Sequence, residues 1–262
     1  MSRILTLAAI TWIEMLRRKD LYVLLILLAA LLGALLTMNV YGLAGVTGYV
    51  KDTGLLFVWL LGWILALNTS VRLLPDEEQK GTLFPLLAKP VSRGALIVGK
   101  WLGAWSVSGA ALLCFYLTVG LGVLLKGGAF NLLILTQAIL LHLAALAVLC
   151  SIGIALSTRM NRDAAAVTAY VVTGAAFVLM PRIPAMLTDT EGVAGTVLSV
   201  LYYGFPHFEL FDLRRRLIHE WGCAPWLIVA EVLVYGALLT TGFLALAWLG
   251  YRKRQFTRGA AL

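Results

Sequence analysis

The sequence predicts an all-α membrane protein with six transmembrane helices in a single domain over residues 1–262. Three observations indicate this class. Of the 262 residues, 61% are hydrophobic and only 13% are charged, whereas soluble domains carry about 25% charged residues. Apolar stretches of about 20 residues, the length that crosses a bilayer, recur along the chain. The net charge is +8, and its basic residues gather in a few of the loops.

Residues 2–19 are expected to form a helix that lies on the membrane surface. At about 100° per residue, one side of this helix is charged and the opposite side is apolar. The charged side carries Arg3, Glu14, Arg17 and Arg18, and the apolar side carries Ile4, Leu5, Ala8, Trp12, Met15 and Leu16. Leu7 and Ile10 interrupt the charged side. Such a helix is typical of the headgroup boundary.

Six apolar stretches follow, and turns or charges separate them. The predicted spans are residues 21–40, 54–71, 94–125, 130–156, 164–180 and 226–249. Three glycines over residues 42–48 indicate a turn after the first span, and Lys126-Gly127-Gly128 predicts a tight turn after the third. Pro181 and Pro184 are expected to stop the fifth span.

The basic residues indicate which side of the membrane each end faces. Six spans place both termini on one side, together with the loops after the second and the fourth spans. Fifteen of the 21 Lys and Arg residues fall on that side, and four of the other six lie in residues 182–224. Because basic residues favour cytoplasmic loops, both termini are predicted to be cytoplasmic, and residues 182–224 are predicted to face outward.

The outward segment is predicted to hold an amphipathic helix at the outer membrane surface. Its apolar side is formed by Leu210, Leu213, Leu217 and Trp221. A metal site is the alternative, through His207, Glu209, Asp212 and His219. Because their spacing matches no common metal motif, we favour the helix and expect no metal.

The most charged insert, residues 74–93, lies between the second and third spans and is expected to be cytoplasmic. Pro75 suits the first position of a helix. Asp76, Glu77 and Glu78 would then occupy its first turn, where the helix dipole favours acids. Gly81 interrupts this run. The insert is interpreted as a docking element for a partner, and an ordinary solvated loop is the alternative.

A second short helix, residues 81–90, is predicted within this insert. Thr82 is its candidate N-cap and Pro90 its end. Its apolar face consists of Leu83, Phe84, Leu86 and Leu87. This face would fit a groove on a partner, or would lie back on the bilayer. Ser92 is the predicted N-cap of the third span.

Few polar groups lie at membrane depth. His142 in the fourth span and Glu231 in the sixth are the candidates for a translocation path. For His142 the alternative is a hydrogen bond to a neighbouring helix, and for Glu231 it is a place near the outer headgroups. Gly99-x-x-x-Gly103 would allow close helix contact, for example between two copies. The sequence has no Gly-x-x-x-x-Gly-Lys-Ser/Thr phosphate-binding loop and no aromatic-basic groove pattern for nucleic acid.

The insert resembles the signature of ABC-2 type exporter permeases. The matching residues are Glu78-x-x-Gly81-Thr82-Leu83, Leu86-Leu87-Ala88-Lys89-Pro90-Val91-Ser92-Arg93 and Gly99-Lys100. The resemblance implies a permease that dimerises and docks a separate ATPase through a coupling helix at residues 81–90. The residues assigned to docking are Glu78, Gly81, Thr82, Leu83, Phe84, Leu86, Leu87, Pro90 and Arg93. Pro85 departs from the family pattern.

The family also implies the surroundings of the protein. ATP and Mg²⁺ would be bound by the partner ATPase and no cofactor by this chain. The second permease copy would be identical or a paralogue, in a bacterial inner membrane. Residues 2–19 resemble the family's elbow helix, and residues 182–224 would fold back toward the bilayer and close the exit.

Two other functions compete with a transport subunit that has no catalytic residues. An intramembrane lipid-modifying enzyme would need converging polar groups at membrane depth, and the sequence offers only His142, Glu231 and scattered Ser and Thr. A non-transporting scaffold would bind a partner other than an ATPase. A lipid, a drug-like amphiphile, a glycan and a small peptide fit as substrates equally.

Overall fold

The computed structural model describes residues 3–17, 19–37, 43–79, 92–188, 190 and 192–252, and these residues contain helices and loops but no strand. The helices in chain order are α1 (Arg3–Arg17), α2 (Asp20–Thr37), α3 (Leu43–Gln79), α5 (Arg93–Leu125), α6 (Leu132–Ser157), α7 (Arg162–Leu179), η1 (Met180–Arg182), α8 (Ile183–Thr188), α9 (Val193–Gly204), η2 (Phe208–Phe211), α10 (Arg214–His219) and α11 (Trp226–Arg252).

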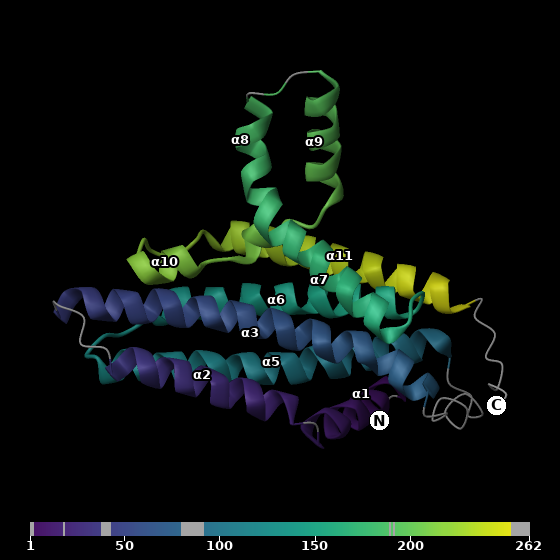
Figure 1. Ribbon diagram of the computed structural model, residues 1–262, viewed down its shortest axis with the longest axis horizontal. Helices are drawn as coiled ribbons and strands as arrows, with labels where there is room; N and C mark the ends of the chain where they lie inside the picture. The colour runs from purple at the N-terminus through teal and green to yellow at the C-terminus, as the bar shows by residue number, and fades with distance from the viewer. Residues whose placement is uncertain are drawn as a thin grey trace.

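The long helices form a bundle with α3, α5 and α6 at its centre. Helices α2, α3, α5 and α6 run side by side along the long axis (Figure 1), and α3 contacts both α5 and α6. The centre is apolar, and Leu65, Leu112 and Leu146 are at most 1% exposed. Helix α11 packs on α6, and α7 packs on α3 and α6.

Five helices among the described residues are long and apolar enough to cross a membrane. They run over Thr47–Gln79, Arg93–Leu125, Leu132–Ser157, Arg162–Thr188 and Trp226–Arg252. They correspond to the second to sixth predicted spans. Helix α2, at Asp20–Thr37, covers most of the predicted first span, and residues 38–40 lie outside the described residues. The chain is therefore a helical membrane protein, and the sixth crossing stays a prediction.

Helix α3 is longer than the sequence predicts. Gly45 and Gly48 lie inside it, so the turn expected over residues 42–48 is wrong for both residues, and Gly42 lies outside the described residues. Pro75 is also inside α3 and does not begin a helix. A proline removes one helical hydrogen bond. The buried neighbours Leu73 and Leu74 favour continuation, because tertiary packing overrides local propensity.

The other helix ends agree better with the sequence. The Ser92 hydroxyl oxygen caps α5 by accepting a hydrogen bond from the Ala95 amide at 3.2 Å, as predicted. The tight turn after α5 is also confirmed. Gly127 has a positive φ of 74°, and the Gly128 amide donates to the Val123 carbonyl at 3.0 Å. Glycine suits this left-handed position at a helix end.

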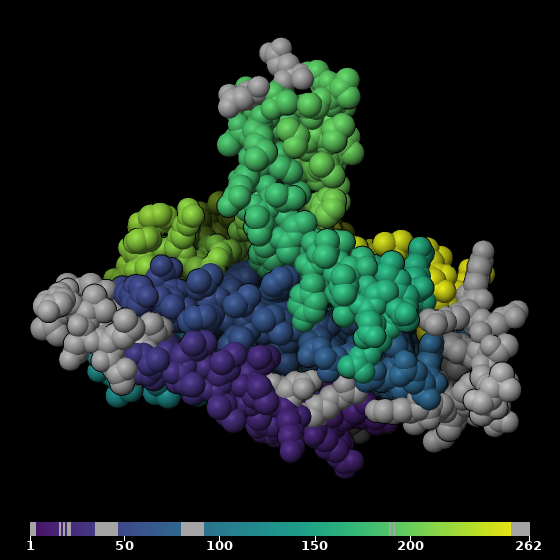
Figure 2. Space-filling model, viewed as in Figure 1, coloured from purple at the N-terminus to yellow at the C-terminus, as the bar shows by residue number. Residues whose placement is uncertain are grey.

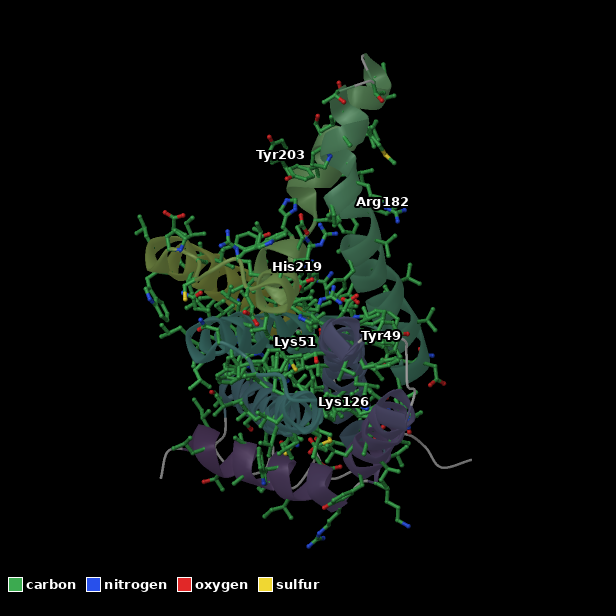
Figure 3. The ribbon with its side chains drawn as sticks, turned by 90° about the vertical axis from the view of Figure 1, so that its left-hand side faces the viewer. Tyr49, Lys51, Lys126, Arg182, Tyr203 and His219 are labelled. Atoms are coloured by element: carbon green, nitrogen blue, oxygen red, sulfur yellow. The ribbon has the colours of Figure 1, made fainter. Side chains whose placement is uncertain are left out.

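Helix α7 ends at Leu179, close to the predicted stop at Pro181. The helical path nevertheless continues through η1 and α8, because proline is tolerated in the first turn of a helix. Helices α8 and α9 project from the bundle, roughly at right angles to its long axis, and we call these two helices the arm (Figure 1). Tyr203 lies on the arm, and Arg182 lies near its base (Figure 3).

The predicted amphipathic helix through residues 210–221 is wrong. Two short helices, η2 and α10, replace it. The Asp212 carboxylate accepts a hydrogen bond from the Arg214 amide at 2.9 Å, which forms a turn between them. Glu220 has a φ of 54° and ends α10. Leu217 is buried, whereas Trp221 is 64% exposed, so the predicted apolar side is split.

Candidate functional site

The predicted helix at residues 81–90 lies outside the described residues, and with it Gly81, Thr82, Leu83, Phe84, Leu86, Leu87 and Pro90. The structure does describe both chain segments that lead into it. One is the end of α3, which includes Glu78, and the other is the start of α5, which includes Arg93. These two segments are the candidate site, together with the helices that hold them.

A buried ion pair joins the two segments. The Lys100 ammonium on α5 donates a hydrogen bond to the Glu77 carboxylate on α3. The side chain of Lys100 is 1% exposed and that of Glu77 is 9% exposed. A charge taken out of water is costly unless a partner of opposite charge lies beside it. This pair therefore fixes the end of α3 against the start of α5.

A second ion pair reaches α7. The Arg162 guanidinium at the start of α7 lies 3.4 Å from the Asp76 carboxylate. The Arg162 side chain is 39% exposed, so solvent screens this pair and it contributes little to stability. It nevertheless places the end of α3 beside the loop between α6 and α7.

Arg93 holds the end of the last helix. Its Nη1 donates to the carbonyl oxygens of Tyr251 at 2.8 Å and Arg252 at 2.7 Å. These are the last carbonyls of α11, which have no partner within their own helix. A cation at this position also interacts favourably with the helix dipole. We call Asp76, Glu77, Arg93, Lys100 and Arg162 the charged cluster; it connects α3, α5, α7 and α11.

Helix α1 packs against the same part of α5. It runs across the end of the bundle rather than along it (Figures 1 and 3). Leu7 and Thr11, both buried, lie against Gly99 and Gly103, where an added Cβ would be 2.7 Å from the Leu7 Cβ and 2.5 Å from the Thr11 Cβ. The interpretation of Gly99-x-x-x-Gly103 as a contact between two copies is therefore wrong. Leu7, which interrupts the charged side of the predicted helix, therefore belongs to the face of α1 that packs on α5.

The two predicted residues of a translocation path occupy different environments. His142 on α6 is 1% exposed. Its ring stacks on Trp59, with 4.1 Å between ring centroids, and its Nδ1 lies 3.2 Å from the Tyr116 hydroxyl. Glu231 is exposed on α11. The structure thus gives His142 a helix-connecting hydrogen bond and leaves Glu231 on the surface.

Three of the four residues in the alternative metal site have other polar partners, and the fourth, His219, stacks on Trp221. His207 Nδ1 lies 2.9 Å from Glu209, and Arg214 donates to both carboxylate oxygens of Asp212 at 2.7 to 3.0 Å. Within the described part of the chain, no group of three or more His, Cys, Asp or Glu side chains is placed to hold a metal ion.

Polar contacts also fix the end of the bundle opposite the charged cluster, where Figure 3 labels Lys51, Lys126 and His219. Lys51 donates to Glu220 at 2.9 Å, and this hydrogen bond and the ammonium charge lower the pKa of Glu220. The buried Gln137 amide exchanges two hydrogen bonds with the backbone of Ala224, at 2.9 and 3.0 Å.

Sequence reasoning missed the Glu77–Lys100 pair, although it contained a signal. Lys100 lies seven residues into an apolar helix, and a buried cation there requires an acid nearby. The sequence interpretation instead placed Glu77 in the first turn of a helix that begins at Pro75, whereas Glu77 lies near the end of α3.

Comparison with known proteins adds one finding. The chain matches the family model described as "ABC-2 family transporter protein" over residues 5–254. No curated protein sequence matches the chain.

Proposed function

The chain belongs to the ABC-2 transporter family and is a membrane-embedded permease component of an ABC transporter, and we propose that it works as an exporter whose ATPase docks at residues 81–90. ATP and Mg²⁺ would be bound by that ATPase, and this chain would supply no catalytic group. The proposed location is a bacterial inner membrane, with both termini in the cytoplasm.

The charged cluster is the observation that carries this proposal. A docking element passes force to the helices that hold its two ends. The ion pair between Glu77 and Lys100 joins the end of α3 to the start of α5. Arg93 connects the start of α5 to the end of α11 through its two hydrogen bonds. Helix α1 packs on α5 at the same level. Force on residues 81–90 would therefore reach most of the bundle.

A second permease chain is the other proposed partner. The arm has exposed apolar residues that include Val193, Val197 and Val200, which are 82%, 52% and 68% exposed. A second copy or a paralogue that packs on the arm would cover these apolar side chains.

Docking is tested by co-purification of the ATPase with the permease. We expect the triple variant Leu83→Asp, Phe84→Asp and Leu87→Asp to lose the ATPase, because it places three carboxylates on the proposed contact face. The matched control is Leu210→Asp, which charges a leucine that is 47% exposed in η2. Undiminished binding of the ATPase by the triple variant would refute docking at residues 81–90.

A further inference from the structure

Two neighbouring cavities lie between α3, α7 and the outer loop. The first has a volume of about 330 Å³ and is lined by Leu56, Trp59, Trp63, Gly174, Phe177 and Arg214, among others. The second has a volume of about 520 Å³, and its lining includes Asp52, Phe208, Glu209, Asp212, Arg214 and Arg215. Phe177 and Arg214 line both, so the two cavities adjoin. We call the first the groove and the second the outer cavity.

The groove is apolar and opens at the side of the bundle. Leu56, Leu60 and Val178 line it and are 49%, 41% and 52% exposed. All three lie in predicted spans. Figure 2 shows α7 lying over α3 on this face of the molecule. A lipid chain could therefore enter the groove sideways from the bilayer without crossing water.

Hydrogen bonds and ring contacts hold the walls of the groove. The Trp63 indole N–H donates to the Thr173 hydroxyl at 2.8 Å, and the Tyr170 hydroxyl donates to the Ile64 carbonyl at 3.2 Å. Trp59 is stacked on the buried His142. The groove is thus formed before a ligand arrives, as is usual for small-molecule sites.

The outer cavity carries charges of both signs. Arg214 lies between the two cavities, with its guanidinium 5.7 Å from the Trp59 ring centroid, and pairs with Asp212. Arg215 is exposed at the lining. The Oε1 of Glu209 lies 2.9 Å from the Nδ1 of His207. Its buried Oε2 has no hydrogen-bond partner among the described residues. A buried carboxylate oxygen without a donor is costly, so a donor from a ligand would be favoured.

We propose that the groove and the outer cavity bind a zwitterionic phospholipid that carries an ammonium group. Its acyl chain would lie in the groove. Its phosphate would lie near Arg214 and Arg215, because guanidinium groups bind phosphate oxygens through paired N–H donors. Its ammonium would donate to Glu209. The inference rests on the proposed function, since it names the class of substrate that the permease carries.

Photocrosslinking in nanodiscs tests the acyl chain. The complex of permease and ATPase, without ATP, is given phosphatidylethanolamine with a photoreactive group on one acyl chain. We expect labels on peptides that contain residues 56–63 and 174–178. Gly174→Leu and Leu60→Trp, which fill the groove from opposite walls, should each reduce labelling about tenfold, equivalent to about 1.4 kcal/mol. Gly242→Leu is the control, because a Cβ at this glycine of α11 meets nothing within 4 Å. Equal labelling of wild type and both groove variants would overturn the proposal.

The headgroup is tested with the same probe on phosphatidylglycerol, which lacks the ammonium. Wild type should prefer phosphatidylethanolamine, and Glu209→Gln should remove that preference. Arg215→Ala should weaken labelling by both lipids. Equal labelling by the two lipids in wild type would refute recognition of the ammonium. Undiminished ATPase binding by the Leu83→Asp, Phe84→Asp and Leu87→Asp variant, with groove labelling as expected, would refute docking alone. ATP hydrolysis by a complex whose labelling is insensitive to Gly174→Leu would refute this inference alone.

Discussion

Replacement of Lys100 by methionine is expected to destabilise the protein strongly. Methionine keeps an unbranched apolar side chain, one heavy atom shorter than that of lysine, and removes the ammonium that donates a hydrogen bond to the Glu77 carboxylate. Lys100 is 1% exposed, so water has little access to replace the lost donor. The Glu77 carboxylate then stays at its buried position and loses this ammonium.

The size of the effect follows from this burial. Removal of one partner of a buried ion pair costs about 3–5 kcal/mol. In a chain of this size, 1 kcal/mol corresponds to about 2–4 °C in melting temperature. Lys100→Met should therefore lower the melting temperature by roughly 6–20 °C.

Melting followed by tryptophan fluorescence in detergent measures this change, since the chain has eight tryptophans. Glu77→Met should cost a similar amount, because it leaves the Lys100 cation buried. The double variant should recover most of the loss, because an apolar pair replaces a buried ion pair at little net cost. Lys19→Met, at an exposed lysine, is the control. A loss below about 3 °C for Lys100→Met, or additive losses in the double variant, would refute the reasoning.

Two further predictions concern the packing of α1 on α5 and the ion pair between Lys51 and Glu220. Gly103→Leu should cost about 1–3 kcal/mol of stability by overpacking and should speed hydrogen exchange in α1, because an added Cβ lies 2.5 Å from the Thr11 Cβ. The control is Gly120→Leu, also in α5, where an added Cβ meets nothing within 4 Å and exchange in α1 should not change. Unchanged exchange in Gly103→Leu would contradict the packing of α1 on α5. Lys51 lowers the pKa of Glu220, so this pair stabilises the protein above the ordinary pKa of a glutamate and loses its effect as the pH falls through the lowered value. Glu220→Gln should accordingly melt slightly below wild type at pH 7 and equally with it in acid, and a difference that persists in acid would count against the pair.

Hydropathy and capping residues predicted most of the helices. The spans expected at residues 94–125, 130–156 and 226–249 correspond to α5, α6 and α11. The N-cap at Ser92 and the turn at Gly127 were also correct, because both depend on local backbone chemistry. The errors arose where tertiary contacts decide. Glycines and a proline predicted breaks in α3, but packing on α5 and α6 keeps it continuous.

The candidate site was predictable only in part. The resemblance directed attention to the insert between the second and third spans, but it assigned Arg93 to docking without its contact to α11. That contact joins residues 158 positions apart, and nothing in a local pattern encodes it. The groove was missed for the same reason, since Trp59 and Phe177 come from two helices that only the fold brings together.

The contacts at the charged cluster differ in strength, and this difference suggests how docking would affect the groove. The Glu77–Lys100 pair is buried, so α3 and α5 should move together. The Asp76–Arg162 pair between α3 and α7 is partly exposed and separable at about 1 kcal/mol or less. Force on residues 81–90 should therefore open the Asp76–Arg162 contact at the end of α3 first. The hydrogen bonds from Trp63 to Thr173 and from Tyr170 to the Ile64 carbonyl hold α7 on α3 at the groove, so we expect the groove to keep its width when the ATPase docks.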